Sequence, residues 1–157
     1  MQLKASTDYG MRAILYLAAQ GTTCSSKDIA EDMSIPRDYL IQLAQLLRNA
    51  GIIEARPGKH GGYRLAKDPA DINVLEIINA LDDDAKQSTR AKRNARKGGE
   101  MVESVKQTYD LIEESMDAYL SSLTVETLLA CVQNQKDSRT FLADRLQDEG
   151  RRLAATV

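Results

Sequence analysis

The sequence has little of what enzymes and metal sites are usually built from. It contains one histidine and two cysteines in 157 residues. A single histidine cannot by itself build the usual triads, and there is no GxSxG, P-loop or HExxH motif. Cys24 and Cys131 lie far apart and outside any CxxC spacing, so they predict neither a disulfide framework nor a zinc site. We therefore expect no enzymatic activity and two reduced thiols, with redox sensing through them as the alternative.

Aromatic residues are also scarce, at 4% with no tryptophan, and there are only 9 glycines and 3 prolines. These counts favour a core of leucine, isoleucine, valine and alanine, and helices over a turn-rich β fold. The length suits one domain, or one domain with an appendage. No apolar run is long enough to span a bilayer, and the N-terminus lacks the apolar core of a signal peptide. We therefore expect a cytoplasmic protein with no membrane partner.

The net charge of -2 is uninformative, but the distribution of charge is not. Three aspartates at 82–84 precede a segment, residues 86–97, that carries six lysines and arginines and no acid. Such a block is typical of a solvated segment, and in some proteins it is an arm that contacts phosphates.

The clearest amphipathic helix begins at Pro36 and ends at Gly51, with apolar residues at steps of three and four. A short helix that Ser25 or Ser26 can cap precedes it, and a first helix capped by Ser6 or Thr7 comes before that. The pair predicts a helix-turn-helix. Four side chains lie off the apolar stripe near the end that enters a major groove, where arginine suits guanine and glutamine suits adenine: Arg37, Asp38, Ile41 and Gln42.

Two short strands, "IIEA" and "YRLA", flank the stretch "RPGKHGG". The glycines allow a tight turn, so this stretch predicts the tip of a β-hairpin. Arg56, Lys59 and His60 would make that tip attractive to phosphate or to a narrow minor groove. His60 has no carboxylate or thiol beside it, so we do not expect a metal site there.

A long helix follows the basic segment and carries an apolar seam with spacings of 4, 3, 4, 3 and 4 residues: Val105, Tyr109, Ile112, Met116, Tyr119 and Leu123. Such a seam needs a partner. It packs either on its own domain or on a second copy, and we favour a dimer because the first domain already has enough helices for its core. A short helix from Thr124 and one more helix complete the chain, with residues 151–157 expected to fray.

The order of these elements, with "YLIQL…LRNAGII" and "GGYRLA", resembles the Rrf-type family of bacterial winged-helix transcription regulators. The resemblance implies a mostly α fold in four parts. A winged helix-turn-helix domain with a small β-hairpin wing occupies residues 1–82. A charged loop, 83–99, stands at the family's effector position. A long dimerisation helix, 100–123, and C-terminal helices and a tail, 124–157, complete it.

The resemblance also implies a dimeric repressor of transcription that binds a partly palindromic operator in double-stranded DNA. Helix 36–50 would enter the major groove and the wing, 56–62, the minor groove. Tyr39 joins the DNA-binding residues on this basis, and Lys4 and Arg48 are candidates for supporting backbone contacts. The alternative for each is a solvated surface side chain.

Many relatives hold an iron–sulfur cluster on three cysteines in the loop before the long helix, since thiolates are its usual ligands. Here that loop contains none, and Ala91 and Ala95 stand roughly where thiolates are expected. We therefore predict no cofactor. The chain is either a cluster-free member, like the cysteine-metabolism repressor, or one whose cysteines were replaced by alanine. Asp8 matches an oxygen ligand of the nitric-oxide-sensing relative, but is otherwise a first-turn acid favoured by the helix dipole.

Two other functions stay open. The first is a sensor of redox state, iron–sulfur status or a small-molecule effector, with the same fold and a signal that enters through Cys24, Cys131 or the basic loop. The second is an adaptor that does not bind DNA and docks a metabolic enzyme, such as one of cysteine biosynthesis, through residues 86–97.

Overall fold

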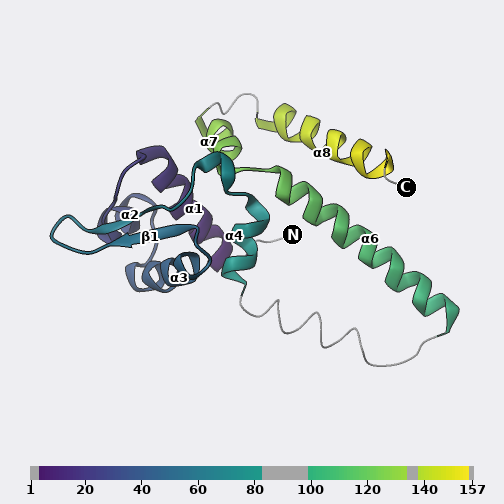
Figure 1. Ribbon diagram of the computed structural model, residues 1–157, viewed down its shortest axis with the longest axis horizontal. Helices are drawn as coiled ribbons and strands as arrows, with labels where there is room; N and C mark the ends of the chain where they lie inside the picture. The colour runs from purple at the N-terminus through teal and green to yellow at the C-terminus, as the bar shows by residue number, and fades with distance from the viewer. Residues whose placement is uncertain (1–3, 83–98, 134–137, 156–157) are drawn as a thin grey trace.

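The computed structural model describes residues 4–82, 99–133 and 138–155. A body of short elements occupies one end, and two long helices extend from it toward the other (Figure 1). The described elements in chain order are α1 Ala5–Gln20, α2 Ser26–Asp32, α3 Arg37–Asn49, β1 Ile53–Arg56, β2 Gly62–Leu65, the 3-10 turn η1 Pro69–Asp71, α4 Val74–Leu81, α6 Glu100–Ser122, α7 Val125–Gln133 and α8 Ser138–Ala155. The predicted basic segment, 86–97, lies outside the described residues. The mostly α fold with one hairpin confirms the predicted fold class.

Local sequence explains where helix α2 begins. The Ser25 hydroxyl accepts a hydrogen bond from the Asp28 N–H at 3.1 Å, so Ser25 caps α2, one of the two predicted alternatives. The prediction for α1 was wrong. Ser6 and Thr7 already lie inside the first turn of α1, so neither is its N-cap. The N-cap is Lys4, whose side chain makes no capping hydrogen bond.

The C-terminal end also differs from the prediction. Residues 151–155, expected to fray, continue α8 as far as Ala155. No proline interrupts residues 138–155, and the glycine at 150 costs a helix far less than a proline would.

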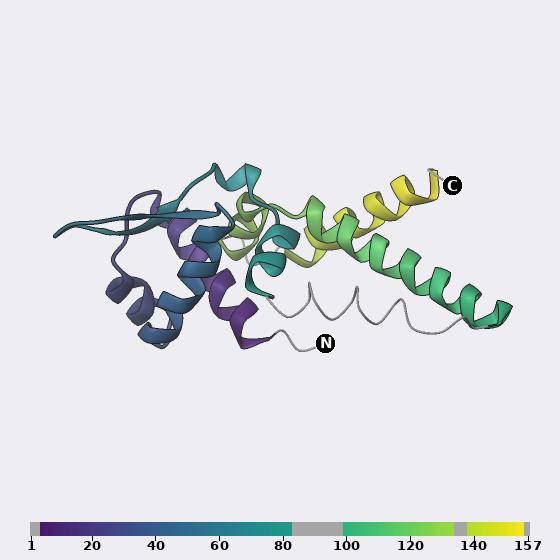
Figure 2. The ribbon, with the colours of Figure 1, turned by 60° about the horizontal axis from the view of Figure 1, so that its bottom comes forward.

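The hairpin is a two-stranded antiparallel sheet whose strands lie within one residue of the predicted ones. Its register pairs Ile53 with Leu65 at the base and Arg56 with Gly62 beside the tip. The hairpin projects from the body on the side away from α6 and α8 (Figure 2).

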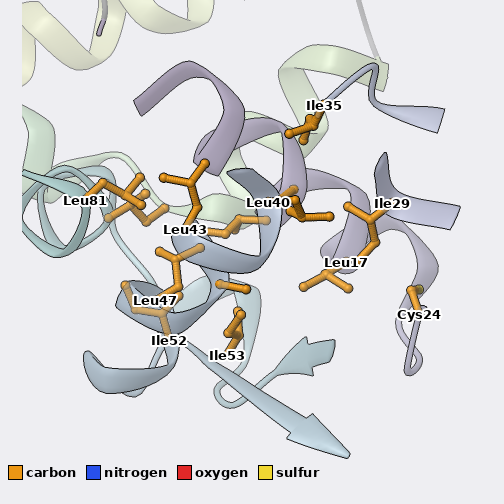
Figure 3. Packing of buried hydrophobic residues seen from close by; sticks show 14 of the residues in the cluster. Leu17, Cys24, Ile29, Ile35, Leu40, Leu43, Leu47, Ile52, Ile53 and Leu81 are labelled. Atoms are coloured by element: carbon orange, nitrogen blue, oxygen red, sulfur yellow. The ribbon is translucent and has the colours of Figure 1, made fainter. Parts of the chain in front are cut away.

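The core gathers the apolar sides of α1, α3 and α4 together with Ile52 and Ile53. Leu40, Leu43 and Leu47 point from α3 into this cluster and are 2%, 2% and 1% exposed (Figure 3). Burial of their side chains is the main stabilisation that α3 receives, because an isolated helix of this length is marginal in water. The apolar stripe from which α3 was predicted is therefore the surface that packs α3 onto the body.

A short backbone pairing joins the C-terminal helices to this body. The Val74 N–H donates to the Leu123 carbonyl at 2.9 Å, and the Val125 N–H donates to the Ile72 carbonyl at 2.8 Å. Ile72 and Val125 are fully buried beside this pairing. From it, α6 and α8 extend side by side away from the wing (Figures 1 and 2). No helix in the described part of the chain is long and apolar enough to cross a membrane.

Candidate nucleic-acid interface

The outer face of α3 is polar and accessible. Four residues predicted from the sequence to face a major groove are all exposed: Arg37, Asp38, Ile41 and Gln42. Ile41 is 43% exposed while its neighbour Leu40 is 2% exposed, so the helix is sharply divided between core and solvent. The Arg37 Nε donates to the Ser26 hydroxyl at 3.4 Å, which holds this guanidinium at the junction of α2 and α3. The helix-turn-helix thus presents a guanidinium, a carboxylate, an amide and an apolar side chain together.

Tyr39, also predicted to contact DNA, is only partly exposed. Its ring meets the ring of Tyr9 edge-on, with centroids 5.8 Å apart and planes at 82°. The Arg12 guanidinium lies over the other ring of this pair, 5.4 Å from its centroid. Tyr39 therefore packs α3 onto α1 while part of its side chain remains accessible.

The two residues named as supporting contacts both have partners within the chain. Lys4 pairs with Asp82 at 2.6 Å, which ties the start of α1 to the end of α4. Arg48 donates to the side-chain carbonyl of Gln45 at 2.8 Å, near the C-terminal end of α3. Neither residue lies at the exposed N-terminal end of α3.

Helix α1 also positions the turn between α2 and α3. The Arg12 guanidinium makes two hydrogen bonds to the Asp8 carboxylate, one of them at 2.6 Å, and reaches the Met33 carbonyl at 3.4 Å. The Tyr16 hydroxyl donates to Asp32 at 2.7 Å, and this hydrogen bond raises the pKa of Tyr16 to about 12. These contacts attach α1 to the end of α2, just before the turn that leads into α3.

The loop of the wing is a tight turn that carries the three predicted cations. Arg56, Lys59 and His60 are exposed, and no residue in the described parts of the chain forms an ion pair with Lys59 or His60. The Gly61 N–H donates to the Gly58 carbonyl at 2.9 Å and closes the turn. A Cβ atom on Gly61 would lie 2.3 Å from the Arg56 carbonyl oxygen, so glycine is required at this position.

The sequence did not predict how the wing is attached to the body. Cys24 and Tyr63 exchange two backbone hydrogen bonds, of 2.9 Å and 2.8 Å, which place a third short segment beside β2. A Cβ atom on Gly62 would lie 2.0 Å from the Cys24 carbonyl oxygen, so only glycine permits this approach. The Cys24 side chain is 8% exposed, and its burial raises the pKa of the thiol. The sequence predicts that Gly61 and Gly62 are both turn residues. In the structure Gly62 instead lies against Cys24, where the wing is attached to the body.

The long helix α6 exposes most of its predicted seam. Four seam side chains are between 43% and 65% exposed: Val105, Tyr109, Ile112 and Met116. Tyr119 is half-buried. Leu123 is 6% exposed because it lies at the pairing with α4, inside its own chain. The seam thus changes from open surface to internal core as it approaches the body.

Helix α8 covers one side of this seam only partly. Between the two helices runs a groove of about 370 Å³. Its apolar lining is Leu111, Ile112, Met116, Tyr119 and Leu146. Ile112 and Met116 remain about half exposed in the presence of α8, so the single chain leaves an apolar surface open here.

The residues at the family's cluster position do not fit an iron–sulfur cluster. The loop sequence, 83–98, contains no cysteine, so the thiolates that would bind iron are missing. Asp8, the remaining candidate ligand, is engaged by Arg12 through both carboxylate oxygens. Across residues 4–82, 99–133 and 138–155, no group of three or more His, Cys, Asp or Glu side chains is placed to hold a metal ion.

Known proteins of similar sequence are transcription regulators. Residues 3–131 match the family model described as Rrf2, iron-dependent transcriptional regulator. The HTH-type transcriptional regulator NsrR of Bacillus subtilis (strain 168) is 33% identical over 144 residues, which cover 90% of this chain and 97% of that protein. NsrR of Shouchella clausii is 31% identical over 144 residues, covering 90% of this chain and 95% of the relative.

Solved structures with a similar fold include proteins of the same kind. IscR of T. potens superposes with a TM-score of 0.69 at 28% identity, covering 87% of this chain and 91% of that one. CymR of B. subtilis, described as its global cysteine regulator, gives a TM-score of 0.67 at 25% identity and covers 83% and 97%. With the helix-turn-helix and wing described above, these similarities confirm a DNA-binding regulator of transcription rather than an enzyme. The chain belongs to the Rrf2 family of helix-turn-helix transcription regulators.

Proposed function

We propose that the chain acts as a homodimeric repressor that binds a partly palindromic operator. In each subunit, α3 enters the major groove through Arg37, Asp38, Ile41 and Gln42, with Tyr39 at its border. The wing places Arg56, Lys59 and His60 at the adjacent minor groove and its phosphates.

The observation that carries this proposal is the division of α3 into a buried apolar face and an exposed polar one. Leu43 and Leu47 are almost fully buried, so the helix is held firmly while its opposite face remains open. Arginine and glutamine on that face are the side chains suited to base edges in a major groove. The cationic loop of the wing adds phosphate attraction that does not depend on sequence.

The dimer is supported by the open seam of α6. Tyr109, Ile112 and Met116 are 65%, 52% and 48% exposed, an arrangement that favours a second copy over contact with solvent. Two copies related by a two-fold axis would present two α3 helices and two wings to one duplex, and a palindromic site would match that symmetry.

The test is selection of duplexes from a random-sequence pool by the purified protein, followed by affinity measurements on the strongest site. We expect Arg37→Ala to cost about 1–3 kcal/mol on that site and to relax its sequence preference at one position. We expect Lys59→Ala to weaken binding to all sequences and to reduce the salt dependence by about one phosphate contact.

Lys106→Ala is the matched control, because it removes one cation from α6, far from the wing. Transcription from a promoter that carries the selected site, with and without the protein, then tests repression. Selection of no duplex would contradict operator binding, and activation of the promoter would contradict repression. Full affinity in the Arg37 and Lys59 variants would show that the groove assignment is wrong.

A further inference from the structure

Helix α3 leaves one large apolar side chain in solvent. Ile41 is 43% exposed, while every other large apolar side chain in the described residues 4–82 is buried or half-buried. The remaining exposed large apolar residues of the described chain all lie on α6, α7 and α8. A single exposed isoleucine is common on a protein surface, so its meaning depends on the groups around it.

The neighbours of Ile41 are the polar side chains of the exposed face of α3. Residues three and four apart lie next to each other on a helix, so Ile41 lies between Arg37 in the preceding turn and Gln45 in the following one. Asp38, three residues before it, borders it as well. Ile41 is therefore an apolar spot inside the surface that would meet base edges.

The C-terminal half of the same face is engaged in its own hydrogen bonds. The Gln45 amide donates to the side-chain carbonyl of Asn49 at 2.8 Å, and the Arg48 guanidinium donates to the Gln45 side-chain carbonyl at 2.8 Å. Within the described part of the chain, by contrast, the side chain of Gln42 makes no hydrogen bond. The groups available for base contacts thus extend along α3 as far as Gln42, and Ile41 lies among them.

An isoleucine side chain has one apolar counterpart in a major groove. The edges of adenine, guanine and cytosine present hydrogen-bond donors and acceptors there, whereas thymine also presents a methyl group. Contact with that methyl group removes apolar surface of both partners from water. Against the N4 amino group of cytosine, the same side chain would displace water and supply no hydrogen bond in its place. Ile41 therefore favours thymine over cytosine.

We propose that Ile41 is a specificity-determining residue that recognises the methyl group of one thymine in each half of the operator. The inference rests on the proposed operator binding and extends it, because it names a base and the chemical group by which that base is selected. It also confines base contacts of α3 to the region before Gln45.

The test replaces the thymines of the strongest selected site with uracil, one symmetric pair at a time. Uracil lacks only the methyl group and pairs with adenine in the same way. We expect one pair of positions at which affinity of the wild type falls by about fourfold for each half-site, the factor that corresponds to burial of one methyl-sized group. Uracil at the other thymines should have little effect, because phosphate contacts do not depend on the base.

Cytosine at the sensitive position gives a second test. Cytosine should lower the affinity further than uracil does. Its 5-methyl derivative places a methyl group at nearly the same point in the groove, so it should recover about fourfold of the affinity lost. No recovery would contradict recognition of the methyl group.

Two variants assign the effect to one side chain. Ile41→Ala ends the side chain at Cβ, so this variant should bind the thymine and uracil sites equally. Gln45→Ala, one turn later on the same exposed face, is the matched control and should retain the full difference between the two sites. Thermal unfolding verifies that each variant is folded, and Ile41→Ser replaces the alanine variant if that one is not.

A selected site in which no thymine is sensitive to uracil overturns the inference. A sensitivity that persists in the folded Ile41 variant, or that is lost equally in the Gln45 variant, also overturns it. If the wild-type protein selects no sequence at all, the proposed function fails and the inference fails with it. If selection succeeds and uracil has no effect, only the inference is wrong.

Discussion

Helices α3 and α6 have similar apolar spacing and opposite surroundings. On α3, Leu40, Leu43 and Leu47 are 1% to 2% exposed. On α6, Tyr109 and Ile112 are 65% and 52% exposed. Both helices repeat apolar residues at steps of three and four, so both were predicted to bury one side.

The difference shows that periodicity identifies which side of a helix is apolar but not what covers it. Helix α3 is surrounded by elements near in sequence, α1, α2, β1 and α4, which close over its stripe. Helix α6 extends beyond the body and contacts α4 and α8 along part of its surface. An apolar face left open in this way is typical of an interface with another molecule.

The largest expected effect comes from the buried stripe of α3. Leu43→Ala should lower the free energy of unfolding by about 2–5 kcal/mol, because it removes buried methyl groups and leaves a cavity. Ile41→Ala, on the exposed face of the same helix, should change it by less than about 0.5 kcal/mol. Urea unfolding followed by circular dichroism measures both. Equal losses would contradict the division of α3 into buried and exposed faces.

A second comparison sets a glycine of the body against one of the C-terminal helices. Gly62→Ala should destabilise the protein by about 1–3 kcal/mol and weaken DNA binding, because its Cβ atom would displace the wing from Cys24. Gly150→Ala on α8 meets no atom within 4 Å and should be neutral or slightly stabilising. The measurements are thermal unfolding and duplex affinity. A Gly62 variant that binds DNA like the wild type would show that this attachment does not position the wing.

The exposed seam of α6 gives a prediction about assembly. Ile112→Asp should weaken the dimer by about tenfold or more, roughly 1.4 kcal/mol, because association would bury an unpaired carboxylate. Glu114→Ala on the same helix should leave it unchanged. Sedimentation velocity over a range of concentrations reports the dissociation constant. A wild-type protein that stays monomeric at micromolar concentration would remove the basis for the proposed dimer.

The smallest expected effect concerns the two thiols. Cys24 lies in the body, where burial limits access and raises its pKa, whereas Cys131 on α7 is only partly buried. At about pH 8 we expect iodoacetamide to modify Cys131 first and Cys24 chiefly in the unfolded chain, because the thiolate is the reacting form. Peptide mass spectrometry over time measures the order. Earlier modification of Cys24 would contradict its burial beside the wing.

Much of the fold could be predicted because it follows from local patterns. The stripe of α3 predicted its bounds to within two residues, and Ser25, one of the two predicted caps, lies at the start of α2. The cations of the wing were recognisable because glycines surround them. The Arg12 contact with the turn and the Cys24–Tyr63 pairing were not predictable, since each joins residues about 20 to 40 positions apart with no periodic signal.

The sequence by itself determined the elements and their chemistry: which faces are apolar, where helices start, and that a cationic turn follows a polar helix. These depend on neighbouring residues and on the fixed periods of helix and strand. Only the tertiary structure decided that Leu123, which directly follows α6, belongs to the core while Ile112 on α6 faces outward. It also decided that Gly62 is an attachment point. Such outcomes depend on which distant segments meet in space, and that is settled by the packing of the whole chain.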